Sequence, residues 1–415
     1  MCSCEEMLIM KLNRWTRVLL GAGIVSYSSV LMAEEATNQV LTAVSSTTLS
    51  GYVDTSAIWK FGTGNALLPG RSNDGSNKQD GFNLDAIKLS LSKPMSEANW
   101  GAGYQVDFLY GPDAYLYSNS WFDSTTDFAI KQAFVSLRVP LGRGLKVQMG
   151  VFDTCVGYEV FDSGSNPNFS RSYGYYIEPL SHTGVLTSYS WTDWLDTSFG
   201  VANSYSSIIN ARPGHLNLSG YAPASEAEKT LLGLITLKAP ESFGGFKGTT
   251  LNFGVVSGLP AYDPATGAGG AAQDIVNLYG GLNVPTPLKG FTFGAAYDYR
   301  FSNGSDITPP TDLDAKHASA AGFYTIYELT PKVTLANRVE YATGSGGTWG
   351  TALPKEEFFG DAFTVDYKLW QNVTTRAELR WDRELTGAGN VFGGSATRDP
   401  DRDAVSLAFN VIYKF

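Results

Sequence analysis

"WGAGYQVDFLY", residues 100–110, carries the pattern that decides the fold. Successive side chains of a β-strand point to opposite faces, so strict alternation predicts a half-buried strand. Ten steps of about 3.3 Å, tilted by about 40°, rise roughly 25 Å, which is the height of the apolar band of an outer-membrane barrel. One face holds Trp100, Ala102, Tyr104, Val106, Phe108 and Tyr110, and the other holds Gly101, Gly103, Gln105, Asp107 and Leu109.

The same alternation recurs along the rest of the chain. In "VTTRAELRWD" (373–382), one face is apolar and the other carries Arg376, Glu378, Arg380 and Asp382 in succession. The pattern is weaker in 128–139, 229–239 and 317–328. Sixteen such segments lie near 50–61, 82–92, 100–110, 128–139, 145–155, 182–191, 194–204, 229–239, 248–258, 274–284, 289–301, 317–328, 332–342, 359–369, 372–383 and 402–415.

The connections between these segments alternate between long and short. The short ones, such as "PLGRG" (140–144), contain the usual turn residues. This rhythm predicts an all-β, transmembrane up-and-down antiparallel β-barrel of about sixteen strands over 50–415. The turns and both termini would then be periplasmic, and the long loops external. The long connections lie near 62–81, 111–127, 156–181, 205–228, 259–273, 302–316, 343–358 and 384–401.

A soluble all-β protein, such as two sandwiches or a propeller, would also alternate, with its apolar face inside. Three features favour the membrane barrel. Aromatic residues crowd the ends of the apolar face, the polar face carries dense opposite charges separated by glycine, and no linker divides the chain. A spanning backbone must satisfy its own hydrogen bonds, which closed barrels do.

The N-terminus has the composition of a cleaved secretory signal over 1–33. Lys11, Arg14 and Arg17 precede an apolar run that ends at the small residue Ala33. A helical membrane anchor is the alternative, but the run is short of about 20 apolar residues. Residues 34–49 would form a short periplasmic segment. Translation could start at Met1, Met7 or Met10.

Charge and cysteine content exclude several classes of function. The chain has 30 basic and 40 acidic residues, a net charge of −10. Nucleic-acid binding needs a basic patch, so we expect no nucleic-acid partner. Cys2 and Cys4 leave with the signal, and Cys155 alone can form neither a disulfide framework nor a C-x-x-C metal site. We expect Cys155 to be a small apolar residue at a strand end, and we expect no metal and no cofactor.

Two adjoining stretches resemble a known family. "IKQAFVSLRVPLGRGLKVQMGVFDT" (130–154) and "VGYEVFDSGSNPNFSRSYGYYIEPLSHTGVLTSYS" (156–190) are similar to the beta-barrel porin-2 (OmpL-like) family of bacterial outer-membrane proteins. The resemblance is strongest over 82–190 and implies a passive pore, without a site map. The ending "VIYKF", with Phe415, is similar to the signal by which such barrels engage their assembly machinery.

A barrel of about 16–18 strands leaves an aqueous channel, because side chains cannot fill it. Charges on its wall set a field that selects among permeating ions and small hydrophilic solutes. Residues near segment ends, such as Lys88 and Asp382, could instead face solvent above the membrane. Porins of this size are often trimers, which makes a homotrimer a candidate assembly. The predicted pore wall comprises Asp107, Lys146, Gln148, Asp298, Arg300, Arg338, Glu340, Asp366, Lys368, Arg376, Glu378 and Arg380.

The third long connection, 156–181, is the candidate constriction, by analogy with the third external loop of general porins. It has no steady period and is rich in aromatic residues, which would pack it against the inner wall. Asn166, Asn168 and the glycines would permit tight turns. An external loop packed on its neighbours is the alternative. Glu159, Asp162 and Glu178 would face a basic wall of Arg338, Arg376 and Arg380, and Arg171 would bridge the loop acids.

Other functions leave weaker traces in the sequence. A barrel-borne hydrolase would need a serine beside a histidine held by a carboxylate. Ser181 precedes His182, but the sequence places no third partner, and His215 and His317 are isolated. We therefore predict that the protein is not an enzyme. An adhesin or receptor barrel, acting through its external loops, is the remaining alternative.

Overall fold

The computed structural model describes residues 47–61, 78, 80–117, 127–217, 220–223, 228–261, 274–302, 316–349, 353–387, 391–392 and 402–415. Residues 49–415 form one compact unit. The signal expected at 1–33 and nearly all of the segment expected at 34–49 lie outside the described residues.

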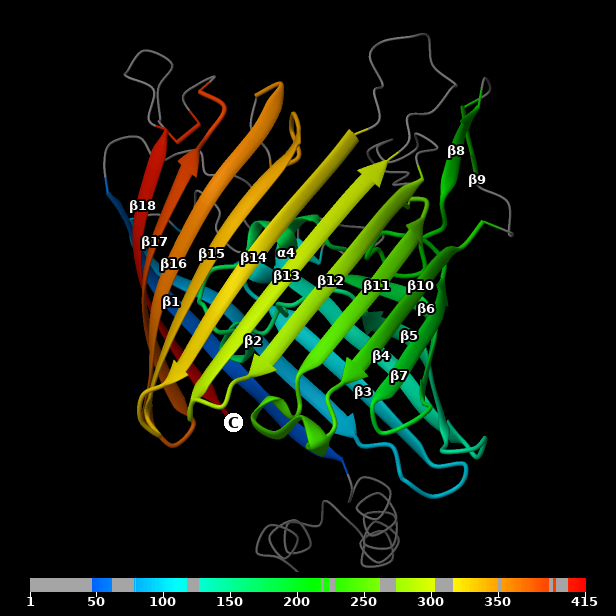
Figure 1. Ribbon diagram of the computed structural model, residues 1–415. Coiled ribbons are helices and arrows are strands. Elements are labelled where there is room, and N and C mark those ends of the chain that lie inside the picture. The colour runs from blue at the N-terminus through cyan, green and yellow to red at the C-terminus, as the bar shows by residue number, and fades with distance from the viewer. Residues whose placement is uncertain are drawn as a thin grey trace, which may run out of the picture. The chain divides into compact units, whose positions relative to one another are not determined.

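Sixteen antiparallel strands close into a barrel, in which each strand pairs with its neighbours in chain order and β1 pairs with β18 (Figure 1). The strands are β1 (Thr48–Phe61), β2 (Gly81–Lys93), β3 (Ala102–Tyr110), β4 (Phe128–Val139), β5 (Leu145–Asp153), β6 (Ser181–Ser190), β7 (Leu195–Ala202), β10 (Thr230–Lys238), β11 (Thr250–Gly258), β12 (Ile275–Pro285), β13 (Phe291–Ser302), β14 (Lys316–Glu328), β15 (Val333–Ser345), β16 (Lys355–Trp370), β17 (Val373–Glu384) and β18 (Asp403–Lys414). The predicted fold is therefore confirmed, and each predicted strand, including the three weak ones, is present within a few residues.

The long connections contain elements that alternation could not reveal. A hairpin of β8 (Gly214–Asn217) and β9 (Gly220–Pro223) lies in the connection between β7 and β10. The remaining elements are short helices: η2 (Pro112–Leu116), η3 (Ser163–Ser165), α4 (Tyr173–Ile177) and η4 (Glu241–Phe246). Among the described residues, the helices are too short and too polar to cross a membrane.

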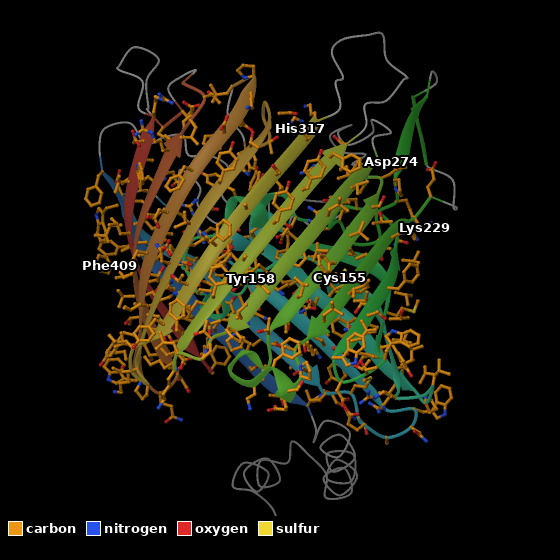
Figure 2. The ribbon with its side chains drawn as sticks, in the orientation of Figure 1. Cys155, Tyr158, Lys229, Asp274, His317 and Phe409 are labelled. Atoms are coloured by element: carbon orange, nitrogen blue, oxygen red, sulfur yellow. The ribbon has the colours of Figure 1, made fainter. Side chains whose placement is uncertain are left out.

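The two faces of the barrel wall differ as the alternation predicts. Large apolar side chains such as Phe253 and Phe409 are about half exposed on the outer face, where no protein covers them. In Figure 2, Phe409 projects outward from β18. The inner face carries the buried charged residues, among them Asp107, Arg338 and Arg376. An apolar exterior and a charged interior invert the arrangement of a soluble protein, and they match a membrane barrel.

Hydrogen bonds on the inner face tie the first strand to the last ones. Asn410 of β18 donates to the Asp54 carboxylate and to the Thr55 carbonyl oxygen of β1, at 2.9 Å for the latter. Arg376 of β17 donates to the Asn410 amide oxygen at 2.7 Å. A polar seam therefore reinforces the backbone pairing that closes the barrel.

Candidate constriction site

The connection between β5 and β6, residues 154–180, folds into the barrel. Figure 1 shows its short helix α4 within the ring of strands. It starts at β5 and ends at β6, and it contacts the inner faces of β2, β15 and β17 through Lys88, Arg338 and Arg376. In the strand order of the barrel, β16 lies opposite β6. We call residues 154–180 the inner loop.

Three arginines of the last strands bind the backbone of the inner loop. Arg338 donates to the Ser170 carbonyl oxygen at 2.6 Å, and Arg380 donates to the Arg171 carbonyl oxygen at 2.8 Å. Arg376 donates to the Ser163 carbonyl oxygen at 2.9 Å. All three guanidinium groups are buried. They dock the inner loop and do not line open water.

Carboxylates on the same strands bind the amide groups of the inner loop. Glu378 of β17 accepts hydrogen bonds from the amide nitrogens of Phe169 and Ser170, at 2.7 and 3.0 Å. Glu340 of β15 accepts from the Tyr173 amide nitrogen at 2.7 Å. Alternating charges of β15 and β17 thus match the alternating donors and acceptors of the loop backbone. We call Arg338, Glu340, Arg376, Glu378, Arg380 and Asp382 the charge ladder.

Aromatic stacking fixes the other parts of the inner loop. The ring of Tyr158 stacks on Tyr324 of β14, with centroids 4.2 Å apart. A Cβ at Gly294 of β13 would lie 2.0 Å from the Tyr158 hydroxyl, so any other residue there would displace the Tyr158 ring from this position. Further along, Tyr173 stacks on Phe358 of β16 at 5.4 Å and contacts Trp349 edge-on. The aromatic residues therefore pack against the inner wall, as predicted.

Glu159 meets the arginine wall as the sequence predicts. Its carboxylate accepts from Arg338 at 2.9 Å, and both side chains are 0% exposed. It also accepts from the Ser172 amide nitrogen at 2.7 Å and from the Tyr324 hydroxyl at 3.2 Å. Breaking such a buried, hydrogen-bonded pair would leave a buried charge without a partner.

Asp162 does not face the arginines. It pairs with Lys88 of β2 at 2.9 Å and accepts from the Tyr52 hydroxyl at 3.0 Å. Burial raises the pKa of Asp162, but Lys131, Lys88 and Tyr52 outweigh it, and the net pKa is lowered. The Asp162 and Lys88 side chains remain 24% and 13% exposed. The expectation that Lys88 could face solvent above the membrane is wrong, because it lies on the inner wall.

Glu178 does not face the arginines either. Its carboxyl is hydrogen-bonded to Asp298 of β13, which requires one of the two groups to carry a proton. Burial raises the pKa of Glu178 well above its ordinary value, and the Asp298 charge raises it further. Gly174 permits the contact, since a Cβ there would lie 2.7 Å from an Asp298 oxygen.

Arg171 does not bridge the loop acids. It donates to the carbonyl oxygens of Val160 and Phe169, at 3.0 and 2.8 Å, and to that of Phe161. Its guanidinium group therefore supplies the donors that these carbonyl oxygens would otherwise find in a helix or a sheet.

The two asparagines of the inner loop form side-chain hydrogen bonds, and neither adopts a left-handed backbone conformation. Asn166 exchanges hydrogen bonds with the backbone of Val160, at 2.9 and 2.6 Å. Asn168 donates to Thr364 of β16 at 2.7 Å.

Asp382, predicted as a candidate for solvent exposure, is instead buried and accepts from the Tyr173 hydroxyl at 3.0 Å.

The remaining predicted wall residues occupy inward positions but divide into two groups. Asp107 is buried and accepts from Ser90 at 2.6 Å, and Arg300 lies over the Tyr205 ring at 6.0 Å. Gln148 is also buried. In contrast, Lys146, Asp366 and Lys368 lie toward the strand ends that the short turns join, and they remain partly or fully exposed. These three side chains are the members of the predicted pore wall that solvent can reach.

Several residues of the site were missed by sequence reasoning. Tyr52, Tyr324 and Trp349 read as ordinary aromatic residues, yet they contact Asp162, Glu159 and Tyr173. Lys131 of β4 pairs with Asp153. The available signal was that Tyr52 and Tyr324 occupy inward-facing positions of their strands. An aromatic side chain on the charged inner face indicates that another part of the chain packs against it.

The histidine and cysteine sites are structural in character. His182 is buried beside Thr154, whose hydroxyl lies 3.3 Å from its Nε2. Cys155 follows β5, is half-buried and packs with the apolar cluster around Val156. Among the described residues, no group of three or more His, Cys, Asp or Glu could hold a metal ion.

The geometry is that of a wide closed barrel with a loop folded into its interior, which is the architecture of a channel protein. Residues 46–415 match the beta-barrel porin-2 (OmpL-like) family, and the chain belongs to that family. The protein is therefore an outer-membrane channel of the porin class. A comparison with curated protein sequences gives no match.

Solved structures share the fold at low sequence identity. An anion-selective porin from Comamonas acidovorans is 10% identical, with 89% of this chain and 99% of that chain covered and a TM-score of 0.58. The outer membrane channel DcaP of Acinetobacter baumannii is 11% identical, with 89% and 97% covered and a TM-score of 0.54. The in-vitro folded OmpT of Vibrio cholerae, in its trimer form, is 13% identical, with 89% and 99% covered and a TM-score of 0.52.

Removing Glu378 is expected to loosen the inner loop. The Glu378→Ala substitution leaves two loop amide groups without a partner, and charge-assisted hydrogen bonds of this kind contribute about 1.5–3 kcal/mol each. We expect larger and noisier single-channel conductance. Glu357→Ala, on the outer face of β16, is the matched control. Equal conductance in the two variants and the wild type would show that Glu378 does not hold the loop.

The Glu178–Asp298 contact is expected to make the inner loop sensitive to pH. A raised pKa means that the docked loop holds a proton that a released loop would lose, so docking weakens as pH rises above the ordinary carboxyl value of 4.5. Loop noise in single-channel recordings should therefore increase with pH in the wild type and much less in Glu178→Gln. Glu241→Gln, at an exposed turn, should keep the wild-type profile. A wild-type profile in Glu178→Gln would contradict this role.

Proposed function

We propose that the protein conducts ions and small hydrophilic solutes by passive diffusion, without catalysis, and that the inner loop is its constriction. The observation that carries this proposal is the path of the inner loop, which leaves the wall at β5 and β6 and contacts Thr364 of β16, on the opposite side of the ring of strands. The even strand number and the short turns support a periplasmic location for both termini.

The field that a permeating solute encounters comes from wetted charges. Glu159 and Arg338 are fully buried and bonded to each other, so their charges largely cancel. Asp162 and Lys88 are partly exposed, and Lys146, Asp366 and Lys368 line the wider part of the wall. We therefore assign ion preference to this second set and a structural role to the charge ladder.

Three kinds of partner complete the proposal. OmpT of Vibrio cholerae, which shares the fold, has a trimer form, and this supports a homotrimer here. The apolar outer wall requires outer-membrane lipid around it. Phe415, which directly follows β18, is our candidate contact with the barrel-assembly machinery.

Liposome swelling tests the pore itself. Purified protein in liposomes should admit small sugars faster than large ones, because a constriction of fixed size sieves solutes. Empty liposomes, and liposomes with heat-denatured protein, give the baseline. Swelling at the baseline rate for every solute would exclude a diffusion pore and favour an adhesin or receptor.

Reversal potentials test the assignment of charges. Asp162→Asn should shift ion preference toward anions, because it removes a wetted negative charge beside Lys88. Glu159→Gln should leave ion preference nearly unchanged and instead increase loop noise, because its charge is buried against Arg338. A larger shift in ion preference for Glu159→Gln than for Asp162→Asn in a salt-gradient measurement would show that the charge ladder sets the ion preference.

A further inference from the structure

Two polar side chains lie on the outer face of the barrel. Asn337 of β15 donates from its amide nitrogen to the Asp361 carboxylate of β16 at 2.7 Å. Their chain neighbours Ala336, Arg338 and Ala362 are buried on the inner face. Because side chains alternate along a strand, Asn337 and Asp361 point away from the lumen.

The register places this pair inside the apolar band. Tyr341 of β15 pairs with Phe359 of β16, and the ring of Phe359 packs against Trp381 of β17 at 5.4 Å. On β16, Asp361 is the next outward-facing residue after Phe359 and lies deeper in the apolar band. On β15, Asn337 is the second outward-facing residue below Tyr341. Aromatic residues mark the membrane interfaces of such barrels, so both polar side chains are below the interface.

Hydrocarbon cannot satisfy these groups. Among the described residues, the second carboxylate oxygen of Asp361 and the side-chain oxygen of Asn337 have no hydrogen-bond partner. Lipid tails carry no donors, and headgroup phosphates would repel a carboxylate. Polar groups at membrane depth face protein or water rather than lipid. The observation therefore calls for a protein surface that supplies a donor.

The same side of the barrel offers such a donor. Tyr297 of β13 is 51% exposed, and its hydroxyl has no partner within the part of the chain that the structure describes. Its register neighbours are Gly280 and Ala321, so its ring stands above a surface of small residues. Tyr297 pairs with Ala321, Ala321 with Tyr341, and Tyr341 with Phe359, so Tyr297 lies one outward position along the register from Asp361.

The spacing of donor and acceptor fits contact between identical subunits. β13 and β16 are separated by three strand spacings, or about 14 Å. A cyclic assembly brings one edge of a patch on each subunit against the other edge of the same patch on the next. Asp361 near one edge and Tyr297 near the other can then meet across the interface.

We propose that the outer face of β13–β16 is the interface between copies of this chain, in which Asp361 accepts a hydrogen bond from Tyr297 of the next copy. The Tyr297 side chain, which projects beside Gly280 and Ala321, gives the interface its shape. The Asn337–Asp361 pair orients the hydrogen bond between the two copies. This inference names the contact face of the homotrimer proposed above. It is independent of pore activity, which liposome swelling measures separately.

Cysteine cross-linking in native outer membranes tests the interface. Cys155→Ala first removes the cysteine of the inner loop. Phe363→Cys, beside Asp361 on the outer face of β16, should then give cross-linked dimers and trimers of this chain with a short bis-maleimide. Met149→Cys, 68% exposed on the outer face of β5, is the matched control and should stay monomeric.

A charge change tests the polar contact itself. Asp361→Lys should convert the purified oligomer to monomers in mild detergent by native mass spectrometry, whereas Asp361→Asn should retain most of it. If Asp361→Lys fails to assemble in the membrane, the cross-linking result decides alone. Three outcomes would overturn the proposal: a monomeric wild type, stronger cross-linking through Met149→Cys than through Phe363→Cys, or cross-links from Phe363→Cys mainly to another protein.

Discussion

The width of a sixteen-strand barrel is the constraint on which the rest of this structure depends. Its own side chains cannot reach across the interior, so the wall alone leaves an open channel. The inner loop supplies what the wall lacks. It adds Tyr158, Tyr173 and Ile177 to the lumen, where they form apolar clusters with inward residues of several strands. The loop that we propose as the constriction therefore also packs the interior of the barrel.

Placing a loop without regular structure inside a barrel raises a second problem, because its backbone donors and acceptors lose water. The charge ladder solves it from the wall. Glu378 binds two amide groups and Arg380 binds a carbonyl group, while Arg338 binds both a carbonyl oxygen and Glu159. The charges of the last strands are thus used to dock the loop, and we propose that the partly exposed pair of Asp162 and Lys88 acts on solutes.

Prediction from the sequence succeeded where the physics is local. Alternation located the strands because burial on one face imposes a period of two, and turn residues located the short connections. The same reasoning put Arg376 and Glu378 on the inner face correctly. It failed for Asp162, Glu178 and Arg171, since a loop without a period gives no rule for which wall residue each side chain meets.

The sequence by itself determined the barrel, its strand number, the inward position of its charges and the candidacy of the third long connection. Only the tertiary structure decided that Glu178 meets Asp298, that Asp162 meets Lys88, and that Asn337 and Asp361 share an outward patch with Tyr297. The reason is physical. Strand faces follow from the period along one chain segment, whereas these contacts depend on closure, register and loop path, which bring together segments that are distant in the sequence or set strand beside strand.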